Sequence, residues 1–121
     1  EDYKLWITLL MKDIRVKKIN KVLYKYRIHS ESALHKNNQQ AYLMAKLLLG
    51  FANKIEYAKD RASQYYNDYV NAAISESLKN DDYQPNLNDY KYFILQPKTK
   101  IKLFLYMKHP KTLKMISKGS K

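Results

Sequence analysis

The stretch MAKLLLGFANKIEYAKDRASQYYNDYVNA, residues 44–72, decides the fold class that the sequence predicts. Apolar residues recur along it at steps of four and three, which is the spacing of an amphipathic helix or a coiled-coil seam. The members of this seam are Met44, Leu48, Phe51, Ile55, Ala58, Ala62, Tyr65, Tyr69 and Ala72. Two interpretations fit the pattern: two packed helices at about 38–58 and 61–79, or one long helix or coiled-coil seam. A homodimer through the seam at 44–72 is a further expectation.

Composition supports a helical chain. Gly and Pro are scarce, since the 121 residues hold two glycines and three prolines, and strands joined by tight turns need more of both. The chain has no cysteine, which excludes disulfides and thiolate metal sites, and no glycine-rich phosphate loop. The hydrophobic content of 45% is that of a globular domain. We therefore expect a mainly α fold.

The segments before the seam predict one helix and two short strands, and the segments after it predict further helices. Residues 1–13 fit an amphipathic helix, and alternating or β-branched residues predict two short strands at about 15–19 and 22–28. Such strands need a sheet to join, and the chain offers no other convincing strand. After a polar linker at 80–88 a short helix is expected at about 87–95, and Pro110 begins a last basic helix.

The first residues contain the one constellation that suggests chemistry. Asp2 and Trp6 lie four residues apart, so they share a face of the predicted helix. An aromatic ring beside a carboxylate suits a sugar, and a carboxylate that reaches a sugar hydroxyl is able to act as a general base. Taken without further pattern, an acidic pair at a helix start is ordinary capping, and a lone tryptophan is more often a core residue.

Residues 1–34, EDYKLWITLLMKDIRVKKINKVLYKYRIHSESAL, resemble the C-terminal part of the catalytic region of family 2 glycosyltransferases, which are inverting enzymes of the GT-A fold. Three elements of that family pattern occur in order. They are the acidic pair Glu1-Asp2 with Leu5-Trp6, the strand Ile19-x-x-Val22-Leu23, and the ending Tyr26-Arg27-Ile28-His29. The resemblance covers just over a quarter of the chain.

The resemblance implies a role for each matched site residue. Asp2 would be the catalytic base that deprotonates the acceptor hydroxyl. Glu1 and Trp6 would bind the acceptor. Arg27 and His29 would bind the donor diphosphate, and His29 would also contact the metal in some members of the family.

The same resemblance implies that the chain is a C-terminal fragment, inactive alone. The family binds its nucleotide-sugar donor, with Mg or Mn, in an N-terminal half that carries an Asp-x-Asp motif, and this sequence has none. We expect residues 1–36 to be the C-terminal edge of the catalytic domain, 37–97 a helical extension, and 98–121 a basic amphipathic tail. The implied reaction transfers a sugar to a saccharide or lipid-linked acceptor in cell-surface polysaccharide synthesis. No metal or other cofactor is expected to bind the fragment stably.

The tail carries most of the excess charge. Residues 98–121 contain eight of the 23 basic residues and none of the 11 acidic ones, within a net charge of +12. Apolar residues are interleaved with these lysines, namely Ile101, Leu103, Phe104, Leu105 and Met107. This pattern predicts association with an anionic membrane surface through residues 98–118. With the family resemblance, we expect a cytoplasmic protein that is peripheral at the inner face of the cell membrane. The alternative is a solvated tail whose apolar residues pack on the helices.

A second class of function rests on charge and on the seam. The alternative is a basic helical module that binds nucleic acid or associates with itself. Only three of the basic residues are arginines and no recognised motif is present, so no nucleic-acid partner is expected.

Overall fold

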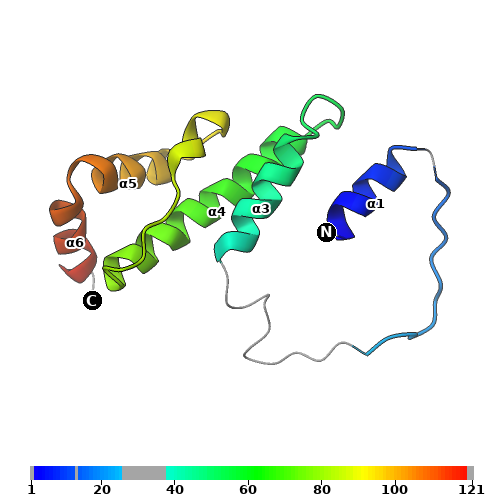
Figure 1. Cartoon of the computed structure of the whole chain (residues 1–121), viewed down its shortest axis with the longest axis horizontal. Helices are drawn as coiled ribbons and strands as arrows, with labels where there is room; N and C mark the ends of the chain where they lie inside the picture. Colours follow the sequence, from blue (N-terminus) through cyan, green and yellow to red (C-terminus); the bar gives the residue numbers. More distant parts are fainter. Residues whose placement is uncertain (1, 13, 26–37, 120–121) are drawn as a thin grey trace. The chain divides into compact units, whose positions relative to one another are not determined.

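The computed structural model describes residues 2–12, 14–25 and 38–119 (Figure 1). The chain divides into two compact units, residues 1–35 and 36–121, and each is described by itself. The predicted mainly α class is confirmed, because every regular element in the described ranges is helical. No helix in these ranges is long and apolar enough to cross a bilayer.

The first unit contains one short helix, α1 (Asp2–Leu10), which ends three residues before the predicted boundary at 13. Residues 14–25 are extended and belong to no ladder, so the predicted strands at about 15–19 and 22–28 are wrong for the described part of the chain. Residues 26–28 lie outside it. The physical reason is the missing partner: an extended segment becomes a strand only when a neighbour satisfies its N–H and C=O groups. The side chain of Val22 accordingly stays 89% exposed.

The second unit is built on a pair of helices, α3 (Asn38–Leu49) and α4 (Ala58–Lys79), which lie side by side (Figure 1). The interpretation of residues 38–79 as two helices is therefore confirmed, and a single long helix is wrong. The first helix, however, ends at Leu49 and not at about 58, and the second begins at Ala58 and not at 61. Residues 50–57 form consecutive turns between them, beginning at Gly50, a weak helix former. The last turn residue, Tyr57, has a left-handed φ of 64° and directs the chain into α4.

The buried face of α4 is wider than the predicted seam. Three seam members, Ala58, Ala62 and Tyr69, are buried, and Tyr65 and Ala72 are only partly buried. The buried face also includes residues outside the seam: Tyr66, Val70, Ala73 and Ile74. The heptad pattern assumed one packing partner, but α4 is covered by α3 along one side and by the later part of the chain along another. A helix covered from two sides buries a wider stripe than a coiled-coil seam does.

The remaining chain folds back over α4. Residues 80–87 form no helix, and the helix predicted at about 87–95 is a 3₁₀-helix, η1 (Asn88–Tyr92). Two further helices, α5 (Pro97–Lys108) and α6 (Pro110–Gly119), each begin at a proline, as predicted for the last basic helix. Together these elements complete one hydrophobic core: Ala45, Ala62, Tyr66, Tyr69, Val70, Ala73, Ile74, Leu87, Phe93, Leu103 and Leu113.

Candidate functional site

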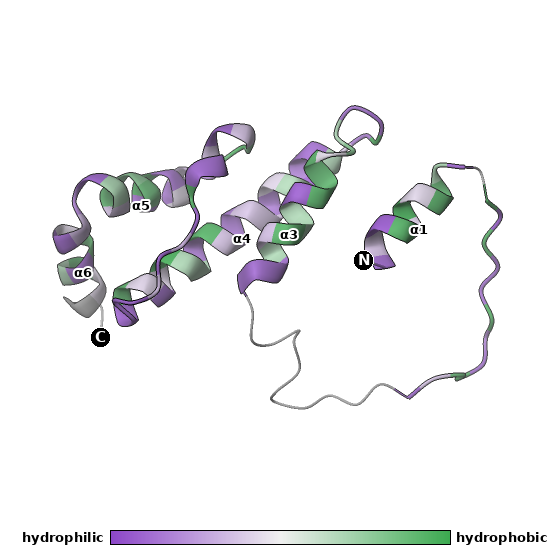
Figure 2. Ribbon diagram, in the orientation of Figure 1, coloured by the Kyte–Doolittle hydropathy of each residue, from purple (hydrophilic) through white to green (hydrophobic). Residues whose placement is uncertain are grey.

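The helix α1 carries the two predicted site residues that the structure describes. Asp2 lies in its first turn, where the helix dipole favours a carboxylate. Trp6 follows one turn later on the same face and is 56% exposed. Hydrophobic residues occupy much of α1, and none of its side chains is buried (Figure 2). The helix therefore presents an acid and an indole together on an open surface.

The other predicted site residues are Glu1, Arg27 and His29, and all three lie outside the described residues. A divalent metal of the kind that the resemblance implies needs several carboxylate or imidazole ligands close together. No group of three or more such side chains occurs within residues 2–12, 14–25 and 38–119. The described residues do not fit a metal site, so no reaction step below passes through one.

A ladder of polar side chains on α4 holds the later part of the chain in place. Its members recur every four residues: Ser63, Asn67, Asn71 and Ser75. Ser63 Oγ accepts a hydrogen bond from the Ile94 N–H at 2.9 Å, and Asn71 Nδ2 donates to Thr99 Oγ1 at 3.0 Å. The four-residue spacing of this ladder is visible in the sequence, but apolar periodicity alone does not predict it.

Asn67 is the member of this ladder whose side-chain amide makes three hydrogen bonds. Its Nδ2 donates to the carbonyls of Ser63 at 2.7 Å and Ile94 at 2.9 Å, and its Oδ1 accepts from the Gln96 N–H at 2.9 Å. The residue is only 3% exposed, so these bonds are shielded from water. They fix the backbone that leads from η1 into α5.

A cluster of aromatic side chains fills the space between α3, α4 and η1. The rings of Tyr66 and Phe93 stack at 4.1 Å between centroids, and Tyr42 lies 5.0 Å from Tyr69. The buried hydroxyls donate to backbone carbonyls, Tyr66 to Leu87 and Tyr69 to Asn86. Burial raises the pKa of Tyr66, and it raises the pKa of Tyr69 to about 12. These rings are packing residues and not a sugar-stacking surface.

The hydroxyl of Tyr42 belongs to a small polar network at the edge of this cluster. It donates to Asp89 Oδ2 at 2.7 Å, and Lys46 Nζ lies 3.4 Å from the same oxygen. The Tyr42 hydrogen bond lowers the pKa of Asp89 despite partial burial, and the bond to Asp89 raises the pKa of Tyr42. The network joins α3 to η1 and leaves no group free for chemistry.

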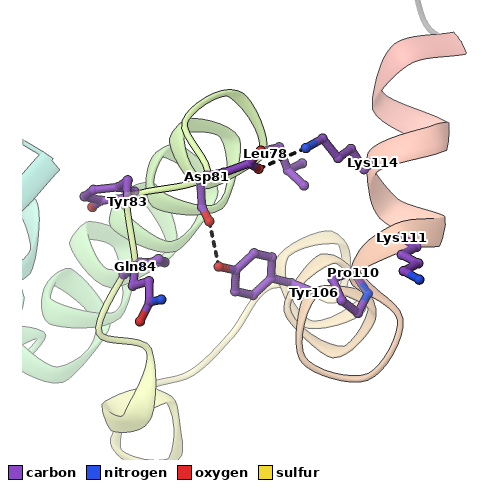
Figure 3. Close-up of a pocket in the computed structure, with 10 residues that line it drawn as sticks. Leu78, Asp81, Tyr83, Gln84, Tyr106, Pro110, Lys111 and Lys114 are labelled. Carbon is purple, nitrogen blue, oxygen red and sulfur yellow. Dashed lines mark hydrogen bonds and ion pairs between the residues drawn. The ribbon is translucent and has the colours of Figure 1, made fainter.

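A hollow of the second unit lies between the end of α4, the segment after it, and α5 and α6 (Figure 3). Its volume is about 450 Å³, and Tyr83, Gln84, Tyr106, Lys111 and Lys114 contribute polar side chains to its wall. These residues come from three separate parts of the chain, so no sequence pattern predicts the hollow.

The polar groups of this hollow are largely paired with one another. Lys114 Nζ lies 2.9 Å from Asp81 Oδ1, and the hydroxyls of Ser77 and Tyr106 are 2.7 Å apart (Figure 3). Asp81 is mostly exposed, and a surface pair of this kind adds little stability. Ammonium, hydroxyl and amide groups suit a polyhydroxylated or anionic ligand, but the lining holds no histidine and no paired carboxylates. The hollow offers binding groups and no reaction centre.

Comparisons with known proteins identified no relative. No protein-family model matches the sequence, and neither a curated protein nor a solved structure matches it.

Proposed function

We propose that residues 1–36 are the acceptor-side edge of an inverting family 2 glycosyltransferase. In this proposal the complete enzyme transfers a sugar from a nucleotide-sugar donor to a saccharide or lipid-linked acceptor during cell-surface polysaccharide synthesis. The support is the ordered series of an acidic pair, a Leu-Trp helix, Ile19-x-x-Val22-Leu23 and Tyr26-Arg27-x-His29. The observation that carries the proposal is the position of Asp2 and Trp6 on one exposed face of α1.

The proposed chemistry follows from these two side chains. The acceptor sugar packs one face on the Trp6 indole, and one of its hydroxyls donates a hydrogen bond to the Asp2 carboxylate. Asp2 takes the hydroxyl proton as the oxygen attacks the anomeric carbon. The bond from that carbon to the donor's diphosphate breaks, and the nucleoside diphosphate leaves with the electron pair. The first turn of α1 favours the ionised, basic form of Asp2.

The remaining matched residues complete the proposed site. Glu1 contributes to acceptor binding, and Arg27 and His29 bind the diphosphate, whose charge suits guanidinium and imidazolium donors. The donor itself is bound by a nucleotide-binding domain outside these 121 residues.

The exposed apolar surface of the first unit supports this arrangement. Leu5, Ile14, Val16, Ile19 and Leu23 are all exposed, as is Val22. A segment of this composition lowers its free energy by burying these side chains against another surface. In the proposal the surface is that of the nucleotide-binding domain, and the extended residues 14–25 become strands when they join its sheet.

The test uses the longest natural polypeptide that contains these residues, supplied with nucleotide-sugar donors and saccharide acceptors. Asp2→Asn keeps the shape of the side chain and removes the base, so transfer should fall by about 10²-fold or more. Donor binding, measured by calorimetry, should change little because the donor contacts lie elsewhere.

The matched control is Asp60→Asn, since Asp60 is also an exposed acid in the first turn of a helix, α4. It should leave transfer unchanged. Equal losses in the two variants, or a loss of donor binding in Asp2→Asn, would remove the assignment of Asp2 as the base.

A further inference from the structure

The helix α5 has two faces of different character. Its inner face packs on α4 through Thr99 and Leu103, both buried. Lys102 also points inward: its Nζ donates to the Asn71 carbonyl at 3.0 Å and to Ser75 Oγ at 2.9 Å. Burial lowers the pKa of this lysine. The inner face is therefore committed to the fold, and this part of the predicted tail is a packed helix.

The outer face of α5 consists of Lys100, Ile101, Phe104, Met107 and Lys108. All five side chains are exposed, and Phe104 is 57% accessible to solvent. Their spacing of three and four residues places them along one exposed stripe of the helix. Three large apolar side chains thus lie between two lysines, and each stays more than half exposed although the His109 ring meets Phe104 edge-on at 6.4 Å between centroids.

The helix α6 also has a buried apolar side and exposed apolar and basic residues. Leu113 is buried in the core, whereas Met115 is 75% exposed and Lys111 is exposed. Hydrophobic and hydrophilic residues alternate along both helices (Figure 2). From residue 98 to residue 121 the chain has no acidic residue to neutralise these lysines.

We propose that the outer face of α5, together with Met115 and Lys111 of α6, docks on an anionic lipid surface. The lysines bind the acidic headgroups, and the apolar side chains enter the boundary between headgroups and acyl chains. The inference does not rest on the proposed sugar transfer, because it uses only the second unit.

Charge and chemistry select lipid over other occupants of this face. A second copy of the chain would bring lysine against lysine, which repels. A nucleic acid would satisfy the lysines, but its phosphates offer nothing to Ile101, Phe104 and Met107. An anionic bilayer surface supplies both negative charge and an apolar layer beneath it.

The experiment is co-sedimentation of the 121-residue chain with vesicles. One set is phosphatidylcholine alone, and the other contains about one-third phosphatidylglycerol, an anionic lipid. The chain should bind the anionic vesicles at least about tenfold more tightly, since several lysines act together. Raising the salt concentration should weaken this binding through screening.

Two variants separate the charged and apolar contributions. Lys100→Gln with Lys108→Gln should weaken binding to anionic vesicles about thirtyfold. Its control is Lys54→Gln with Lys59→Gln, two exposed lysines elsewhere in the same unit. Phe104→Ser should weaken binding about tenfold, whereas Leu43→Ser, at a similarly exposed apolar position on α3, should not. Helix content measured by circular dichroism verifies that each variant is folded.

Three results would overturn the proposal. They are equal binding to neutral and anionic vesicles, absence of binding to both, and equal losses in the test and control variants. Binding to RNA without vesicle binding, or a dimer in solution that depends on Phe104, would assign this face to another occupant and equally reject the lipid surface.

Discussion

Asn67 is the residue on which the path of the chain between η1 and α5 most directly depends. Replacing it with Ala leaves the Gln96 N–H and the Ile94 carbonyl without their side-chain partners and creates a small void. We expect Asn67→Ala to lower the free energy of unfolding by about 2–4 kcal/mol, measured by urea denaturation. Asn53→Ala, at an exposed position between α3 and α4, is the control and should change it by about 0.5 kcal/mol or less. Equal effects would mean that the three hydrogen bonds do not hold the segment.

Asp2 and Trp6 differ from Asn67 in how well the sequence alone predicts a role for them. Asp2 and Trp6 were found because they are close in sequence and match a family pattern. Their exposure on α1 is compatible with the proposed roles, which stay predictions. Asn67 was not found, because an asparagine inside a helix has no sequence signature that tells a buried, satisfied amide from a solvated one. Its partners, Ile94 and Gln96, lie nearly thirty residues away.

Among the elements, helices were predicted well and strands were not. A helix satisfies its backbone internally, so apolar spacing was enough to predict α3 and α4 as a pair, and Pro110 was enough to predict the start of α6. The residues of α5 were predicted only as part of a basic amphipathic tail. A strand depends on a partner elsewhere, and β-branched residues at 14–25 report only a preference for extended backbone. The width of the buried stripe on α4 was missed for a related reason: it depends on how many neighbours cover the helix, which its own sequence does not state.

The aromatic contact between α3 and α4 makes the second unit sensitive to alkali. The folded state holds the pKa of Tyr69 at about 12 and also raises that of Tyr66, while both titrate near 10 when unfolded. Below pH 10 both hydroxyls are protonated in either state, so their contribution to stability is complete. As the pH rises above 10 the unfolded chain loses these protons first, and the free energy of unfolding should fall by about 1 kcal/mol or more per pH unit.

Urea denaturation at several pH values tests this expectation. Tyr69→Phe removes one of the two groups and should make the decline with pH shallower, although it also loses the bond to the Asn86 carbonyl at every pH. Tyr57→Phe, at a side chain that is 71% exposed, is the control and should keep the slope of the unchanged chain. A slope that does not respond to Tyr69→Phe would mean that other groups cause the alkaline loss.

For the molecule as a whole, the core explains why residues 36–121 form a unit. Every core member lies between Ala45 and Leu113. The members come from α3, α4, the segment around η1, α5 and α6, so the apolar side of the predicted tail is part of the fold. From the sequence, membrane binding and packing on the helices were alternatives for that tail. In the structure Leu103 and Leu113 are packed while Phe104 and Met115 remain exposed. Some apolar residues of the tail therefore pack on the helices, and others stay on the surface.

Whether residues 44–72 also join two copies stays a prediction, although Ala58, Ala62 and Tyr69 of that seam are already buried within one chain.

A truncation experiment tests the completeness of this unit. The chain 36–121 contains the entire core, so it should unfold cooperatively in urea with about the same midpoint as the 121-residue chain. A chain ending at residue 96 loses Leu103, Leu113 and the bond from Asn71 to Thr99, and it should be destabilised by at least about 3 kcal/mol. The comparison is informative because the first deletion is the longer, 35 residues against 25, and both remove apolar residues, yet among the described residues only the second removes buried ones. If 36–121 failed to fold while 1–96 unfolded cooperatively, the helical core would depend on the first unit and not on α5 and α6.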